Sequence, residues 1–459
     1  MNYTYDEVIT TIQNARRFGE HTGYEVSKHM LEQLGNPQNG IPFVHIAGTN
    51  GKGSTTAFLC KILEQTGKKI GMFTSPHLVD FEERIRINGV YISKEDVTRL
   101  GNQLLSMEFV LPPTMFDYCL AMAVLYFKEQ QCDLMVMETG IGGRYDSTNA
   151  LGVPELAIIT KIGFDHMGIL GNTLEKIAGE KAGIMKPGCD VVTTEQTPQV
   201  LEVFLKNFAK VNGLQEPVKF VQTRQQWEEG AGELHVPEKT AIYKLSREDC
   251  RYVGGISTKM VVGTYQIENA ALASLSARVL FDRWNKEGTF LTTEAERADF
   301  IQTGIGNAFW KGRLEIINDS PFFMIDGAHN SNGVWALRES LCELYPDEKF
   351  HFIMGVMADK DYEEMIEVLL PLAIDFVTVT PESNRALQSK DLAECIKRKG
   401  VAARYVEDME EIIRPLLPNR TVSSPNSMIV ESQERGKTIA FGSLYFIGAI
   451  EKLLQEYDS

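Results

Sequence analysis

The sequence predicts an α/β protein in which a mostly parallel sheet is flanked by helices and is followed by a smaller α/β domain. Short apolar runs alternate with amphipathic segments of helical length, which is the pattern of parallel strands joined by helical crossovers. Several of these runs end in Gly, Asp or Glu. Because ligands of open α/β sheets bind at the carboxyl ends of the strands, we expect a ligand site there.

In the first half of the chain, the apolar runs are predicted strands and the amphipathic segments between them are predicted helices. The predicted strands are Pro42–Ala47, Lys69–Ser75, Asp133–Thr139, Leu156–Ile162 and Asp190–Thr194. The predicted helices are Ser54–Gln65, Phe116–Glu129 and Leu174–Gly179.

The pattern changes after about residue 224 and then resumes. Ala241–Leu245 and Lys259–Val262 suggest antiparallel strands, and Ile267–Phe281 suggests a helix. The later predicted strands are Phe322–Asp326, Phe350–Val356, Phe376–Thr380 and Thr438–Gly442. The later predicted helices are Val334–Tyr345, Tyr362–Leu372, Leu392–Lys399 and Tyr445–Gln455. We place a boundary near residues 295–312 and predict two domains, 1–300 and 301–459.

Composition limits the class of protein. The 459 residues carry a formal net charge of −16, which disfavours non-specific binding to nucleic acid or anionic lipid. No apolar run approaches bilayer length, and Met1–Glu20 lacks the apolar centre of a signal peptide. The seven cysteines are scattered without CxxC spacing, which favours reduced core thiols over a catalytic cysteine. We expect a cytoplasmic protein without a nucleic-acid or membrane partner.

The strongest local motif is a strand that enters a glycine-rich turn and then a helix, in the manner of a P-loop. It comprises Gly48, Thr49, Asn50, Gly51, Lys52, Gly53 and Ser54. Glycines let backbone N–H groups approach phosphate oxygens, and the helix N-terminus adds partial positive charge. The general G-x-x-x-x-G-K-[ST] pattern would need Gly at Ile46 and a hydroxyl at Gly53. We therefore predict a shortened phosphate loop in preference to an ordinary strand–helix turn.

Polar residues end two further predicted strands. Glu138 follows an apolar run, and a carboxylate beside a phosphate loop suits a nucleotide-bound Mg²⁺. Asp165 and His166 follow another strand in the same way. Lys181 lies on the next predicted helical segment or just after it, where spacing alone favours a solvated charge. An ammonium group cannot bind a metal unless the lysine is modified or deprotonated.

With these motifs in view, the chain resembles the folylpolyglutamate synthase/dihydrofolate synthase family of the Mur ligase superfamily. The resemblance implies a Rossmann-like second domain of the glutamate-ligase type after the ATP-binding domain. It rests on nine motifs in the family's order: Gly48–Ser54, Thr74–Leu78, Glu83–Gly89, Glu138–Asp146, Asp165–His166, Glu180–Gly183, Gly312–Glu315, Asp326–Asn330 and Gly442–Tyr445.

The resemblance implies a role for each matching residue. ATP contacts are expected at Asn50, Gly51, Lys52, Gly53, Ser54, Asn269, Arg313 and Asp326. Two Mg²⁺ ions are expected on Ser75, Glu138, His166 and a carbamylated Lys181. Substrate contacts are expected at Arg84, Phe116, Arg144, Tyr145, Asp146 and Ser443. His329 would contact the incoming amino acid, and Arg84 would bind an acidic tail or order its own loop. We count Lys52, Lys181, His166 and His329 as catalytic candidates.

The implied reaction is the ATP-dependent addition of L-glutamate to a folate or to dihydropteroate. ATP would convert a carboxylate to an acyl phosphate, which the glutamate amine would attack, with two domains excluding water. A monomer is expected. The alternatives are another Mur-type amino-acid ligase and a non-catalytic nucleotide-dependent switch. The choice between dihydropteroate and reduced folates stays open, because Gly23–Lys28 departs from the family's Gly-Leu-x-Arg segment.

Overall fold

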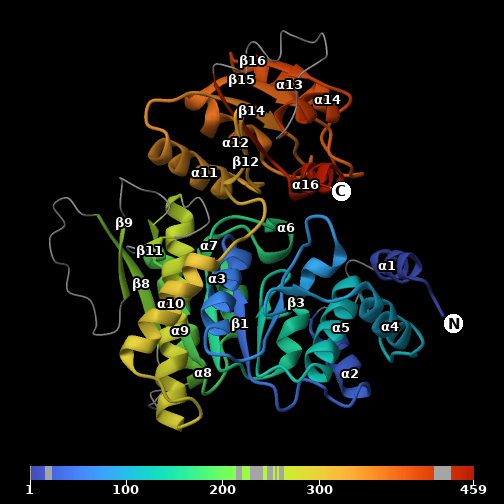
Figure 1. The fold of residues 1–459 in the computed structure, drawn as a ribbon, viewed down its shortest axis with the longest axis vertical. Helices are drawn as coiled ribbons and strands as arrows, with labels where there is room; N and C mark the ends of the chain where they lie inside the picture. The colour runs from blue at the N-terminus through green and yellow to red at the C-terminus, as the bar shows by residue number, and fades with distance from the viewer. Residues whose placement is uncertain are drawn as a thin grey trace. The chain divides into compact units, whose positions relative to one another are not determined.

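The computed structural model describes residues 2–15, 23–212, 220–227, 241–245, 252–253, 256–257, 263–417 and 436–458. The chain forms two compact units (Figure 1). Unit 1 comprises Met1–Leu245, Val253–Thr258 and Gln266–Phe309, and unit 2 comprises Ser246–Tyr252, Lys259–Tyr265 and Trp310–Ser459. No helix in the described ranges is both long and apolar enough to cross a bilayer.

Unit 1 is built on a nine-stranded sheet with the order β4-β3-β2-β5-β1-β6-β7-β8-β9. The strands are β1 Phe43–Ala47, β2 Ile70–Phe73, β3 Ile85–Ile87, β4 Val90–Tyr91, β5 Leu134–Glu138, β6 Leu156–Ile159, β7 Asp190–Thr193, β8 Phe220–Trp227 and β9 Ala241–Leu245. Only the hairpin β2-β3-β4 pairs antiparallel within this sheet. The central strands are buried along their whole length, as expected for parallel strands covered on both faces.

The helices of unit 1 follow the predicted crossovers, with additions. They are α1 Tyr5–Asn14, α2 Glu25–Gln33, α3 Lys52–Glu64, α4 Lys94–Leu105, α5 Met115–Glu129, α6 Met167–Leu170, α7 Leu174–Lys181, α8 Pro198–Asn212, α9 Thr264–Glu287 and α10 Glu294–Asn307. The α9 range begins two residues before the stretch that belongs to unit 1. A short pair, β10 Tyr252–Val253 and β11 Ile256–Ser257, forms a separate sheet.

One predicted pairing is wrong. Ala241–Leu245 is a strand, but it pairs in parallel with β8, with Thr223 opposite Ala241. The antiparallel expectation came from the shortness of the runs, but the 13 residues between β8 and β9 are enough chain for a parallel pair. The other half of that prediction, Lys259–Val262, lies outside the described residues.

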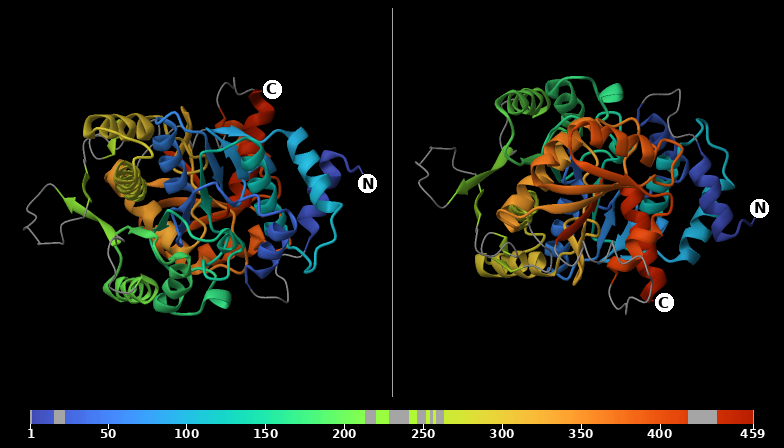
Figure 2. Two further views of the ribbon diagram at one scale, coloured as in Figure 1. Left: turned by 90° about the horizontal axis from the view of Figure 1, so that it is seen from below. Right: turned by 90° about the horizontal axis from the view of Figure 1, so that it is seen from above.

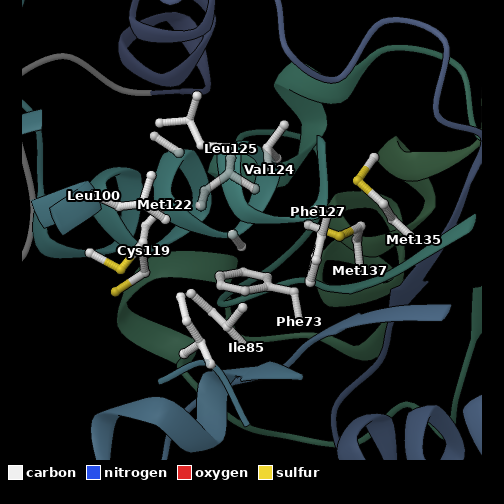
Figure 3. Close-up of a cluster of buried hydrophobic side chains, with 14 of the residues drawn as sticks. Phe73, Ile85, Leu100, Cys119, Met122, Val124, Leu125, Phe127, Met135 and Met137 are labelled. Carbon is white, nitrogen blue, oxygen red and sulfur yellow. The ribbon is translucent and has the colours of Figure 1, made fainter. Parts of the chain in front are cut away.

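One apolar cluster of unit 1 packs α5 against the antiparallel side of the sheet. Figure 3 shows Phe73 of β2 among side chains from α5, including Met122 and Phe127, and from β3, including Ile85. A capping box between Thr114 and Asp117 starts α5. The cluster therefore fixes both the strand before Ser75 and the helix that begins beside Phe116.

Unit 2 is built on a six-stranded sheet with the order β12-β13-β17-β14-β15-β16. Its strands are β12 Glu315–Asp319, β13 Phe322–Ile325, β14 Phe350–Met354, β15 Ala373–Thr378, β16 Ala402–Tyr405 and β17 Lys437–Phe441. Its described helices are α11 Ser331–Leu344, α12 Tyr362–Leu369, α13 Ser389–Arg398, α14 Glu410–Ile413 and α16 Leu444–Asp458. Figure 2 shows the strands in orange and red with α16 alongside them. All pairings are parallel except β12 with β13.

The cysteines largely match the expected core thiols. The buried ones are Cys60, Cys119, Cys132, Cys189 and Cys395. Cys342 is exposed on α11, so the core expectation is wrong for that residue. Its position within a helical segment of mixed polarity gave no sign of its orientation. Cys250 lies outside the described residues.

Candidate active site

The phosphate loop connects β1 to α3 as the sequence predicts. Gly51 takes a left-handed conformation with φ +87° at the N-cap of α3, and it provides no side-chain cap. The first backbone N–H groups of a helix point outward and favour an anion. Lys52 begins the helix, and its Nζ lies 3.4 Å from Thr49 O. The local geometry therefore suits phosphate binding.

The loop is held by the segment after β6. Thr160 Oγ1 donates to Asn50 O at 2.7 Å, and Thr49 N donates to Lys161 O at 3.0 Å. Thr49 Oγ1 donates to Gly163 O at 3.0 Å and accepts from the Gly163 N–H at 3.1 Å. Thr160 was not predicted from the sequence, because a threonine at a strand end has no distinctive local signal.

Asn269 of α9 lies directly against the loop. Its Oδ1 accepts from Thr55 Oγ1 at 3.4 Å, and its Nδ2 donates to Gln266 Oε1 at 3.0 Å. A Cβ atom on Gly51 would lie 2.2 Å from Asn269 Oδ1. The structure thus brings together a glycine and an asparagine that are far apart in the sequence.

Glu138, Ser75 and Lys52 gather at the ends of β5 and β2 and the start of α3. The Ser75 N–H donates to Glu138 Oε2 at 3.2 Å, and Lys52 Nζ lies 4.0 Å from Glu138 Oε1. Glu138 is only 3% exposed. Burial of a carboxylate is costly unless cations or donors compensate it. This arrangement favours a cationic ligand at Glu138.

Lys181, at the end of α7, is buried instead of solvated. Its Nζ donates to Gly48 O at 2.6 Å, so it contacts the phosphate loop itself. Burial, together with the nearby Lys52 charge, lowers the pKa of Lys181 to about 7. The surface position that spacing favoured is therefore wrong, because the Lys181 side chain turns inward to Gly48 O, just after β1.

His166 follows β6 on the loop that leads into α6. It has φ +49°, and its backbone N–H donates to Asp165 Oδ1 at 2.8 Å. Its side chain is 42% exposed, and its Nε2 lies 3.9 Å from Asp165 Oδ2. The imidazole is thus accessible to a ligand, next to a carboxylate.

The predicted substrate residues fall into packed and exposed groups. The ring of Phe116 lies 5.5 Å from that of Phe73, and Tyr145 is 59% exposed. Arg144 Nη2 donates to Gly179 O at 3.0 Å. Asp146 is buried and accepts from the Ile141 N–H at 2.9 Å. Its carboxylate therefore organises its own loop, while Tyr145 presents a ring to solvent.

Arg84 occupies a buried position that favours one of its two predicted roles. Its Nε donates to His77 Nδ1 at 2.8 Å, and the residue is 6% exposed. Burial and the Arg84 charge lower the pKa of His77 to about 4, which keeps the ring a neutral acceptor. The contact orders the loop 77–84.

His45 of β1 is another residue that was not predicted from the sequence. Its Nε2 lies 2.7 Å from Thr148 Oγ1, and that hydroxyl also donates to Asp146 Oδ1. Burial and the Lys186 charge lower the pKa of His45 to about 3. A neutral imidazole thus links the strand before the phosphate loop to the loop that carries Asp146.

In unit 2, Asp326 follows β13 and is buried. It accepts from Tyr265 Oη at 2.7 Å and from the backbone N–H groups of Leu314 and Ala328, both at 2.9 Å. Burial raises its pKa, and the Arg313 charge opposes that rise. The structure therefore places Arg313 and Asp326 together.

His329 and Ser443 also follow strands of the unit 2 sheet. His329 Nδ1 lies 2.8 Å from Gly327 O, and Ser443 Oγ accepts from the Tyr445 N–H at 3.1 Å. Because β13 and β17 are parallel neighbours, both residues lie at the same edge of this sheet.

The donor set of unit 1 fits Mg²⁺ better than a transition metal. In the part of the chain that the structure describes, no group of three His, Cys, Asp or Glu side chains could hold a metal ion. Glu138 and Ser75, which lie next to each other beside the phosphate loop, instead offer oxygen atoms as metal ligands. Hard cations such as Mg²⁺ use one or two carboxylates and complete their shell with phosphates and water.

Comparison with known proteins identifies the family. The Mur ligase middle domain matches residues 46–277, and the Mur ligase glutamate ligase domain matches residues 312–424. A dihydrofolate synthase/folylpolyglutamate synthase of Bacillus subtilis is 34% identical, covering 98% of this chain and 99% of the relative. A folylpolyglutamate synthase of Lacticaseibacillus casei is 32% identical, with coverages of 84% and 87%. A Mycobacterium tuberculosis folylpolyglutamate synthase complexed with ADP superposes with a TM-score of 0.79, at 25% identity and 98% coverage of both chains.

Proposed function

Because the chain belongs to the folylpolyglutamate synthase/dihydrofolate synthase family of Mur ligases, we propose that it adds L-glutamate to a folate. It is an ATP-dependent ligase that forms a carbon–nitrogen bond. The observation that carries this function is the phosphate loop with Lys52, Glu138 and Lys181 around it, on a chain that matches such ligases over almost its whole length. ATP-binding function is assigned to residues 1–300 and glutamate-ligase function to residues 301–459.

The reaction requires activation of a carboxylate before an amine attacks it. ATP transfers its γ-phosphoryl group to the carboxylate, which releases ADP and leaves an acyl phosphate. The amine of L-glutamate attacks the activated carbonyl, and the tetrahedral intermediate collapses to an amide and inorganic phosphate. The backbone of Asn50–Gly53 and the Lys52 ammonium hold the phosphates, and the Ser54 hydroxyl adds a polar contact. Asn269 supports the loop, and Arg313 and Asp326 of unit 2 are further nucleotide contacts.

Ser75, Glu138 and His166, with Lys181 after carbamylation, are the proposed ligands of Mg²⁺, of which we expect two ions. When bound, Mg²⁺ neutralises charge on the phosphates. The burial of Lys181 supports its modification, because burial and the nearby Lys52 charge disfavour the ammonium form and a carbamate supplies an anionic oxygen. The Gly48 carbonyl oxygen, which now accepts from the Lys181 amine, can still accept from the carbamate N–H.

The acceptor site is assigned to Phe116, Arg144, Tyr145 and Asp146, with Arg84 ordering its neighbouring loop. His329 and Ser443 are the proposed contacts of the incoming amino acid. Arg144, Tyr145 and Asp146 follow β5, and His329 and Ser443 follow β13 and β17. Both assignments are supported because ligands of such sheets bind at the carboxyl ends of the strands. Dihydropteroate is a second acceptor to test, because the B. subtilis relative carries both activities in its name.

The activity is tested by ADP release with each substrate omitted in turn. ADP release that needs both L-glutamate and a folate or pteroate supports the ligase. Release with a peptidoglycan precursor and another amino acid would favour a different Mur-type ligase. Tight ATP binding without acceptor-dependent turnover would favour the nucleotide switch.

We also infer that the protein acts as a monomer on small molecules in the cytoplasm. The ATP that it consumes and its buried thiols support a reducing, ATP-rich compartment. Its charge of −16 supports the absence of a nucleic-acid partner. Light scattering on the purified chain checks the mass, and fractionation of cells checks the compartment.

A further inference from the structure

The turn that carries Arg313 has an unusual backbone. It leads into β12, and it contains two left-handed residues, Gly312 with φ +65° and Leu314 with φ +46°. Leu314 is fully buried. A branched side chain rarely adopts this conformation, and it persists only where surrounding contacts hold it. The contacts of this turn therefore decide where Arg313 lies.

Three hydrogen bonds hold the turn. The Gly312 N–H donates to Glu315 Oε2 at 2.6 Å, and the Leu314 N–H donates to Asp326 Oδ2 at 2.9 Å. The Gly327 N–H donates to Gly312 O at 2.7 Å. Asp326 already has a proposed role at the nucleotide, whereas Glu315 has none.

The guanidinium of Arg313 depends on the same backbone. Its Nη1 donates to Gly312 O at 3.0 Å. It also lies over Gly327, where a Cβ atom would be 1.7 Å from Nη1. A shift of Gly312 therefore moves both the backbone and a hydrogen-bond acceptor of Arg313.

Glu315 is held in turn by Glu451 of α16. The charged groups that act on the Glu315 carboxyl are Glu451, which raises its pKa, and Lys311, which lowers it. Lys311 Nζ lies 3.3 Å from Glu451 Oε2, while the buried Glu451 Oε1 has no donor among the described residues. Two carboxylates in contact repel each other unless they share a proton. Burial and the Glu451 charge raise the pKa of Glu315, which favours a proton shared by the pair.

We propose that Glu315 is a positioning residue, which fixes the turn 312–314 through the Gly312 N–H and so places Arg313 for the nucleotide. Glu451 keeps the Glu315 carboxyl group in place from α16. The inference rests on the proposed nucleotide contact of Arg313. The proposal gives a function to the carboxyl groups of Glu315 on β12 and Glu451 on α16, whose mutual repulsion would otherwise only destabilise the protein.

The test compares the KM for ATP with kcat in Glu315→Ala, Glu315→Gln, Arg313→Ala and the Glu315→Ala/Arg313→Ala double variant. Loss of one hydrogen bond to a carboxyl group predicts a KM for ATP about tenfold higher in Glu315→Ala, with kcat retained. Glu315→Gln retains wild-type KM, because its amide oxygen accepts from Gly312 N–H and its amide nitrogen donates to Glu451. The KM for ATP of the double variant is no higher than that of Arg313→Ala, because both changes act through the same guanidinium group.

Asn318→Ala is the matched control on the same strand. It removes a 3.0 Å bond from Asn318 Nδ2 to Leu416 O, at the other end of β12, and it leaves the KM for ATP unchanged. If Glu315→Ala fails to fold, Glu451→Ala is tested in its place. We expect its KM for ATP to rise, by less than the rise expected for Glu315→Ala.

Three results would overturn the inference. The first is an unchanged KM for ATP in Glu315→Ala, or in Glu451→Ala where that variant carries the test. The second is a double variant whose KM for ATP rises by the product of the two single-variant factors. The third is a rise in the KM for ATP of Asn318→Ala equal to that of Glu315→Ala. An unchanged KM in Arg313→Ala would instead refute the nucleotide contact itself, and the two failures are therefore distinguishable.

Discussion

Gly51→Ala tests whether the phosphate loop requires a residue without a side chain. At φ +87° a Cβ costs about 1–2 kcal/mol in backbone energy. The new Cβ would also lie 2.2 Å from Asn269 Oδ1, where ordinary contact begins at 3.4 Å, so one group must move by about 1.2 Å. A displacement of about 1 Å at a reacting site costs up to about 100-fold in rate.

Gly67→Ala is the matched control near the other end of α3. Gly67 has φ +75°, and a methyl group added there would meet no neighbour within 4 Å, so this variant isolates the backbone cost. Both variants should lose about 1–2 kcal/mol of unfolding free energy to backbone strain, measured by urea denaturation. Only Gly51→Ala should also lose ADP affinity, by about tenfold or more in calorimetry. Equal ADP affinity in the two variants would refute the close approach of Asn269 as the reason for glycine.

The other predictions concern charge. Lys181→Ala should lose most of its turnover but keep its fold, as measured by circular dichroism, and small carboxylates should restore part of the turnover. Near-normal activity without added carboxylate would rule out a catalytic carbamate on Lys181. Glu138→Gln should raise the Mg²⁺ concentration needed for half-maximal activity, and an unchanged Mg²⁺ titration would exclude Glu138 as a ligand. Because burial and the Glu451 charge raise the folded pKa of Glu315 above its ordinary value, the protein loses stability as pH rises from the ordinary pKa to the raised one. Glu451→Gln should therefore be more stable than wild type at pH 8 but not at pH 4.5 in urea titrations; an equal difference at both would contradict the shared proton.

Local patterns predicted the parts of the fold that neighbouring residues determine. The phosphate loop, β5 ending in Glu138 and the restart of βα alternation after residue 310 each follow from apolar runs and glycines within one stretch of chain. The partner of a strand does not follow from such patterns. The parallel pairing of β9 with β8 is not encoded in the apolar run of β9 itself.

Long-range side-chain contacts were the least predictable part of the site. Lys181 looked like a solvated charge until its bond to Gly48 O, 133 residues away, placed it at the loop. Thr160 had no motif of its own, and Glu315 lay in the Gly312–Glu315 motif without an assigned role; the Glu451 charge that acts on Glu315 comes from a distant segment. The family resemblance selected Asn269, but only the structure explains it, through the space that Gly51 leaves.

Product mass and ADP yield, measured together, test the central claim most directly. The purified protein is incubated with ATP, Mg²⁺, L-glutamate and, in separate reactions, dihydropteroate, dihydrofolate or tetrahydrofolate. We predict that at least one acceptor gains the mass of a glutamyl residue, with one ADP formed for each residue added. ADP formed at the same rate without acceptor, or no glutamylated product from any of the three, would contradict ligation.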